Sequence, residues 1–105
     1  MDTTILMKKY FMVHLKAGSK RDHDEKEGIA IQKAHLAHLS KLKKDKKICI
    51  AGPFESDSDI LGIAIYSVPN FEIADSLANA DPAVKAGRLT VEVFPFWANA
   101  GSKLF

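Results

Sequence analysis

The chain has little of several features that would assign it to a class at once. It has a single cysteine, Cys49, which excludes an intramolecular disulfide and a cysteine-rich zinc site. Its apolar runs are short, such as residues 48–51, whereas a membrane-spanning helix needs about 20 apolar residues. The N-terminus lacks the hydrophobic segment of a signal peptide, so we expect a cytoplasmic protein with no membrane partner. A net charge of only +2 does not favour nucleic acid as a partner.

What is present is the composition of an ordinary globular protein. Hydrophobic residues make up 47% and charged residues 27% of the 105 residues. That length suits one domain and can bury one core without metal or disulfide support. We expect residues 1–105 to form a single domain, with its core at about residues 8–97 and a tail at each end.

Four segments have the residue types of strands. Residues 8–16 are dense in aromatic and β-branched side chains, and residues 47–54 and 60–68 flank a short acidic loop, as in an antiparallel hairpin. Residues 88–96 alternate apolar and polar positions, and Pro95 indicates an edge strand or a strand end. Cys49 lies within the second strand, where we expect it to be a buried, small apolar side chain.

The intervening segments predict helices. Over residues 24–46, apolar residues and two histidines recur every three or four positions and form one stripe: Ile31, Ala34, His35, His38, Leu39 and Leu42. Acidic residues begin this helix and lysines end it, which complements the helix dipole and accounts for the lysines without a nucleic acid. Asn70 is a suitable N-cap for a helix over residues 71–80, and residues 81–87 predict a one-turn helix capped by Asp81.

The resulting order is βαββαβ, which predicts an α+β, ferredoxin-like fold with both helices on one face of an antiparallel sheet. Residues 8–16 and 60–68, however, are apolar on both strand faces. Two helices cover only one sheet face, and a large uncovered apolar face favours aggregation. We therefore expect a homodimer in which the sheets of two subunits pack together.

Several polar residues could carry chemistry. His35 lies in the middle of an apolar stripe, where an imidazole needs a polar partner; a backbone carbonyl would suffice. Asp81 could serve only as a helix cap, or it could also reach a cleft and orient a histidine that acts as general base. His38, three positions after His35, does not complete a metal ligand set, so we expect no metal. His14 could face either the cleft or the dimer interface.

Three blocks of sequence together resemble the YciI-like family: AHLAHLSKL around His35, AGPF at residues 51–54, and ADPAVKAG at residues 80–87, followed by a strand that ends in FPF. The resemblance spans about residues 8–96. It implies a ferredoxin-like fold that dimerises as a dimeric α/β barrel, and it implies that the family's active-site pair falls on His35 and Asp81. The family is related to muconolactone isomerase-like proteins, and at least one relative is a dehydrochlorinase acting on a chlorinated hydroxyhydroquinone.

The chain also departs from this family pattern in two places. His38 stands where relatives often have a basic residue, and the loop after residue 54 is short and acidic instead of long and glycine-containing. Because this loop lies near the expected cleft mouth, the relatives' substrate cannot be transferred to this chain.

Two functional hypotheses follow from these residues. In the first, the protein is a small enzyme without a cofactor, of lyase or isomerase type, acting on a small cyclic or aromatic molecule. His35 would be the general acid/base and Asp81 its orienting carboxylate, with substrate contacts from His14, His38, Gly52 and Pro53. In the second, the same cleft belongs to a non-catalytic dimeric α/β barrel module that either binds a small molecule or is stress-associated.

Overall fold

Four strands and three helices follow one another along residues 6–105, the part of the chain that the computed structural model describes. Residues 1–5 lie outside this part. The expectation about a signal peptide rests partly on these residues and to that extent also lies outside the described part. No helix within the described part is long and apolar enough to cross a membrane. The elements are, in chain order, β1 (Met7–Ala17), α1 (Glu25–Lys44), β2 (Ile48–Pro53), β3 (Ile60–Tyr66), α2 (Phe71–Asn79), α3 (Pro82–Lys85) and β4 (Leu89–Asn99).

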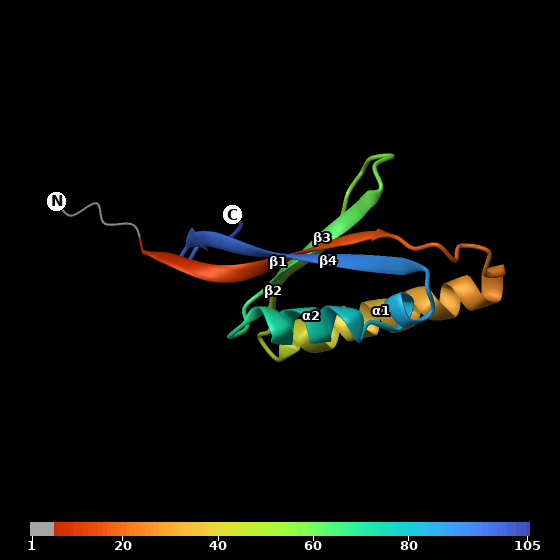
Figure 1. The fold of residues 1–105 in the computed structure, drawn as a ribbon, viewed down its shortest axis with the longest axis horizontal. Coiled ribbons are helices and arrows are strands. Elements are labelled where there is room, and N and C mark those ends of the chain that lie inside the picture. The colour runs from red at the N-terminus through yellow and green to blue at the C-terminus, as the bar shows by residue number, and fades with distance from the viewer. Residues whose placement is uncertain (1–5) are drawn as a thin grey trace.

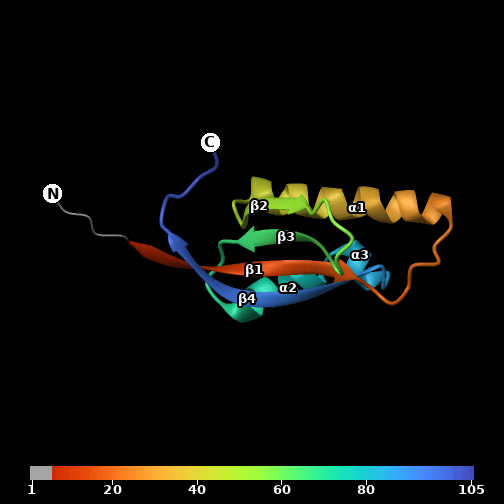
Figure 2. The ribbon, with the colours of Figure 1, turned by 90° about the horizontal axis from the view of Figure 1, so that it is seen from above.

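The four strands form one antiparallel sheet with the order β2-β3-β1-β4. β2 and β3 make the predicted hairpin, and β1 lies between β3 and β4 (Figure 2). Figure 1 shows α1 and α2 together on one side of this sheet. The predicted α+β fold with βαββαβ order is therefore confirmed.

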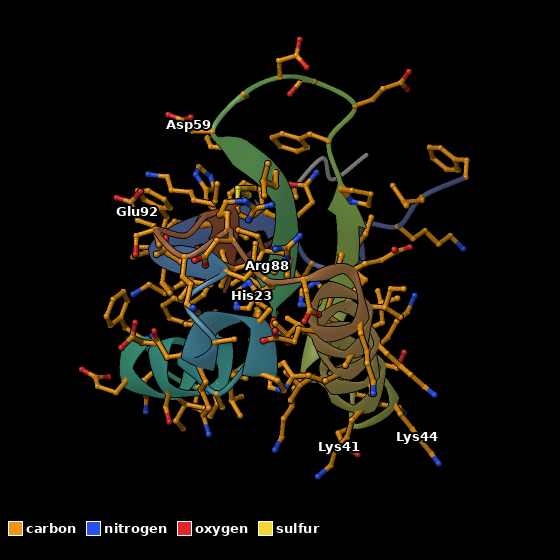
Figure 3. All side chains as sticks on the ribbon, turned by 90° about the vertical axis from the view of Figure 1, so that its right-hand side faces the viewer. His23, Lys41, Lys44, Asp59, Arg88 and Glu92 are labelled. Carbon is orange, nitrogen blue, oxygen red and sulfur yellow. The ribbon has the colours of Figure 1, made fainter. Side chains whose placement is uncertain are left out.

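The charges at both ends of α1 explain where this helix begins and ends. Asp24 is the N-cap, and its side chain accepts a hydrogen bond from the Glu27 N–H at 2.7 Å. Acidic residues occupy the first turn and lysines the last turn. Figure 3 shows Lys41 and Lys44 on the outer side of α1, pointing away from the sheet. The lysine run is thus a solvated helix end that complements the dipole.

Side-chain caps also set the starts of α2 and α3. The Asn70 side chain accepts a hydrogen bond from a backbone N–H in the first turn of α2 at 2.9 Å. The Asp81 side chain does the same for α3, whose first residue is Pro82. Gly87 follows α3 with a φ of +76°, a left-handed conformation that glycine adopts without steric cost. The caps predicted at Asn70 and Asp81 are confirmed.

The two faces of the sheet differ in what covers them. On the helix side, Phe11, Val13 and Leu15 of β1 are at most 8% exposed and belong to the hydrophobic core. The opposite face carries no helix within the described residues. We call it the open face, and the strand register assigns to it Tyr10, Met12, His14, Ile50, Ile63, Ile65, Phe94 and Phe96. The prediction that the first and third strands are apolar on both faces is correct.

Two local expectations are wrong. β4 does not end at Phe96 but continues to Asn99, which pairs with Met7. The strand passes through Pro95 because β4 lies at the sheet edge, where a residue without an N–H is tolerated. Cys49 is exposed instead of buried, because the pairing of edge strand β2 shifts register at this residue.

The β2–β3 hairpin contains a close backbone contact. A Cβ atom added to Gly62 would lie 2.5 Å from the carbonyl oxygen of Gly52, closer than real Cβ contacts allow. Position 62 therefore requires glycine. As a result, the hairpin presents backbone, with no side chain, at this point of the helix-facing surface.

The end of α1 contains a left-handed residue that is not glycine. Lys46 has a φ of +61°. Its N–H and that of Lys47 bond back to the carbonyl oxygens of Lys43 and Leu42 at 3.0 and 2.8 Å. This is a position where helices usually carry glycine, because a Cβ is sterically unfavourable there.

We expect Lys46→Gly to raise the free energy of unfolding by about 0.5–1 kcal/mol, since glycine removes the cost of the left-handed conformation. Urea unfolding followed by circular dichroism measures this change. Lys44→Gly, at the last residue of α1, is the matched control and should lower the stability by about 1 kcal/mol. Equal losses in both variants would contradict the assigned backbone conformation.

Candidate functional site

A buried hydrogen bond joins two residues that are 46 positions apart in the sequence. His35 Nδ1 lies 2.5 Å from Asp81 Oδ2, and the two residues are 8% and 2% exposed. Because a carboxylate oxygen accepts, Nδ1 carries the proton of this bond. The second ring nitrogen, Nε2, is then left to meet a ligand. The structure thus brings together the two residues that the family resemblance pairs.

Local structure holds both partners in place. His35 projects from the stripe of α1 that faces the sheet and is one of the buried residues of that helix. Asp81 stands at the start of α3, where its other oxygen, Oδ1, accepts a hydrogen bond from the Ala83 N–H at 2.9 Å. The carboxylate therefore caps a helix and binds the imidazole at the same time. The predicted cap and a contact with a histidine are therefore both present, although Asp81 itself is not among the residues that line the cavity beside His35.

Tyr66 adds a third polar group near this pair. It is 2% exposed and lies at the end of β3, on the helix-facing side of the sheet. Burial raises the pKa of the Tyr66 phenol well above its usual value, and the negative charge of Asp81 acts in the same direction. The phenol stays neutral at any physiological pH, so it lies near the His35–Asp81 pair without adding charge.

A cavity of about 270 Å³ opens beside the imidazole, between α1 and the β2–β3 hairpin. Its size is near the lower end of small-molecule sites, which span about 300–1,000 Å³, so it suits a ligand of about one ring. The cavity brings three of the predicted site residues together: His35, Gly52 and Pro53. The remaining lining residues are Leu15, Gln32, Leu36, Leu39, Ala51, Leu61, Gly62 and Leu89.

His38 has a partner elsewhere. Its Nε2–H donates a hydrogen bond at 3.0 Å to the backbone carbonyl oxygen of Leu77 in α2. This bond links α1 to α2, and His38 is not among the residues that line the cavity. This contact gives His38 a structural role as a connection between the two helices. Within residues 6–105, no group of three or more potential ligands is placed to hold a metal ion.

His14 lies on the open face, because its strand neighbours Val13 and Leu15 point to the helices. Its ring is 4.7 Å from that of Phe94, centroid to centroid. Glu92, opposite His14 on β4, accepts a hydrogen bond from Lys16 at 2.8 Å, and this bond lowers the pKa of the Glu92 carboxyl. The sheet therefore separates His14 from the cavity that contains His35.

Sequence reasoning did not single out Gln32 or Tyr66. Gln32 lies three residues before His35, and that spacing places two residues on the same side of a helix. This spacing could therefore have indicated that Gln32 lies near His35. Tyr66 occurs in an apolar strand and has no such pattern, because its closeness to Asp81 arises from tertiary packing.

The fold and the site define a class: an α+β, ferredoxin-like domain with a buried His–Asp pair beside a small, mostly apolar cavity. The model of the YCII-related domain matches residues 10–97, and the chain belongs to this family. No curated protein matches the chain significantly.

A solved structure extends the comparison. The chain is similar to 5-chloro-2-hydroxyhydroquinone dehydrochlorinase from Burkholderia phenoliruptrix AC1100, which was solved in complex with 2,5-dihydroxybenzoquinone. The TM-score is 0.60 at 27% sequence identity, and the match covers 81% of this chain and 90% of that one. A protein of similar fold and length thus binds 2,5-dihydroxybenzoquinone, a small oxygenated ring.

We expect the two histidines of α1 to adopt opposite neutral tautomers. At alkaline pH, long-range ¹H–¹⁵N NMR should find the proton on Nδ1 in His35, which donates to Asp81, and on Nε2 in His38, which donates to Leu77. Asp81→Ala should abolish the Nδ1–H preference of His35 alone, with His38 as internal control. Matching tautomers in the unmodified protein would contradict the hydrogen bonds described above.

Proposed function

We propose that the protein is an enzyme that moves a proton on a small oxygenated ring, with His35 as general acid/base and Asp81 as its orienting carboxylate. The buried Nδ1–Oδ2 bond of this pair, beside a cavity, is the observation that carries the proposal. The reaction class is an isomerisation or an elimination, since both begin with the removal of a proton by a neutral base.

Each group has a defined part in this chemistry. Nε2 of His35 takes a proton from the bound ring, and the imidazolium that forms is stabilised by the Asp81 carboxylate. In an isomerisation, the same nitrogen returns the proton to another atom of the ring. In an elimination, the electron pair of the broken bond expels an anionic leaving group, and the proton is later released to solvent.

The cavity suits this class of substrate. Its leucine walls favour a flat apolar body, and Gly52 and Pro53 line it from β2. The similarity to a dehydrochlorinase that binds 2,5-dihydroxybenzoquinone supports a ring with oxygen substituents.

The open face supports a further part of the proposal, that the protein is a homodimer through sheet-to-sheet packing. This face is apolar, and Phe94 on it is 37% exposed in the single chain. A cavity of about 510 Å³ lies at one end of the face, with walls that include Tyr10, Ile65 and Phe96. A second copy that covers the face would remove both the exposed apolar surface and this cavity from water.

Turnover tests the catalytic part of the proposal. With 5-chloro-2-hydroxyhydroquinone as probe and chloride release as readout, His35→Ala should lower kcat/KM by about 10²-fold or more. Asp81→Asn should lower it by at least about tenfold, because an amide can donate to Nδ1 and so favour the wrong tautomer. His23→Ala, which changes a histidine outside the cavity, is the control and should keep full activity.

The same experiment distinguishes the non-catalytic alternative. If the probe binds and His35→Ala weakens its binding while no variant or unmodified protein releases chloride or exchanges ring protons with D₂O, the protein is a binding module. Equal activity in His35→Ala and the unmodified protein would overturn the assignment of the base.

Analytical ultracentrifugation tests the dimer. Phe94→Asp places a charge in the open face and should shift the protein to a monomer with an unchanged circular dichroism spectrum, because burying an unpaired carboxylate is strongly unfavourable. Ile29→Asp is the control, since Ile29 is exposed on α1, away from the open face. A monomer without any substitution, or a dimer that Phe94→Asp leaves intact, would refute this interface.

A further inference from the structure

Among residues 6–105, the lining of the cavity beside His35 includes two polar side chains, His35 and Gln32. Every other lining residue is a leucine, alanine, glycine or proline. A polar ligand in such a site depends on few hydrogen-bonding groups for its orientation, and these groups set specificity. Besides His35, Gln32 is therefore the side chain that can orient a polar ligand in this cavity.

Gln32 and His35 lie on the same side of α1, one helical turn apart. Three residues along a helix correspond to an axial rise of roughly 4.5 Å. His35 is buried at the inner part of the cavity, whereas Gln32 is exposed and so stands at the mouth. Because both residues line the cavity, there is room for a ligand of one ring to reach from His35 outward toward Gln32.

The chemistry of the lining also limits the ligand. No lysine, arginine or carboxylate side chain lines this cavity within residues 6–105. A carboxylate or phosphate group held here would lose water and would meet no permanent cation, only the imidazole of His35, which Asp81 already pairs. Hydroxyl and carbonyl oxygens need only a neutral hydrogen-bonding partner, and the amide of glutamine both donates and accepts.

We infer that Gln32 is a specificity-determining residue that binds a second oxygen of a ring substrate, and that the site selects rings with two hydroxyl or carbonyl oxygens over carboxylated rings. One oxygen meets Nε2 of His35, and the other meets the side-chain amide of Gln32. This inference rests on the proposed function for the ligand class, but it concerns binding and does not require turnover.

Three simple probes separate these contributions in NMR titrations: hydroquinone, phenol and 4-hydroxybenzoate. The unmodified protein should bind hydroquinone most tightly and 4-hydroxybenzoate most weakly. Gln32→Leu keeps the approximate size of the side chain and removes its hydrogen bonds. It should weaken hydroquinone binding by about threefold to tenfold, the range for one neutral hydrogen bond, and change phenol binding by less than about twofold.

The matched control is Lys33→Leu, because Lys33 is the exposed neighbour of Gln32 and does not line the cavity. It should leave all three dissociation constants unchanged. Gln32→Arg supplies the missing cation and should improve 4-hydroxybenzoate binding by about tenfold relative to hydroquinone. The ¹H–¹⁵N spectrum of each variant reports whether the fold is intact.

The remaining outcomes each overturn a defined statement. If Gln32→Leu weakens phenol as much as hydroquinone, or leaves hydroquinone unchanged while His35→Ala weakens it, Gln32 does not read a second oxygen and the inference alone fails. If 4-hydroxybenzoate binds as tightly as hydroquinone, the selection against carboxylates is wrong. Absence of hydroquinone binding overturns the inference together with the proposed ligand class. The expected pattern without turnover leaves the inference standing and removes the catalytic proposal.

Discussion

The carboxylate of Asp81 is the group on which the geometry of the site depends. A buried carboxylate is unfavourable unless its oxygens are paired. Here both oxygens are used, one by the backbone at the start of α3 and the other by the imidazole of His35. Bonds to a charged acceptor are stronger than neutral ones, which offsets the loss of water. The conformation of a one-turn helix and the orientation of the histidine are thereby coupled.

The sheet divides the molecule into two regions with different chemistry. On the helix side, small residues such as Ala64, Ala74 and Ala78 are buried, and they leave room for close packing of helix on sheet. The His–Asp pair and its cavity lie in this layer. On the other side, the open face is apolar apart from His14, which lies opposite Glu92 of β4. Successive side chains of a strand point to opposite faces of the sheet, so a single strand such as β1 contributes residues to both regions.

Much of the fold followed from local patterns. The stripe of α1, the caps Asn70 and Asp81, and the two-faced strands each have a periodicity or residue type that the structure confirms. The expectations that failed, the end of β4 and the burial of Cys49, depend on which strands lie at the sheet edges, and that is a tertiary property. The His35–Asp81 contact spans 46 positions, and no local pattern encodes it. The family resemblance supplied the pairing, whereas spacing alone would have suggested Gln32 as a neighbour of His35.

The glycine contact in the β2–β3 hairpin has a consequence for how such a site diversifies. Backbone atoms of Gly52 and Gly62 approach so closely that position 62 admits no side chain. The strand wall of the cavity therefore has little freedom to change by substitution. The helix wall has more freedom to change, because Gln32, Leu36 and Leu39 project from α1. Any helix-forming residue at these positions would preserve that helix. Duplicated genes of this architecture would acquire new ligands through replacements on one helix, while the sheet kept its shape.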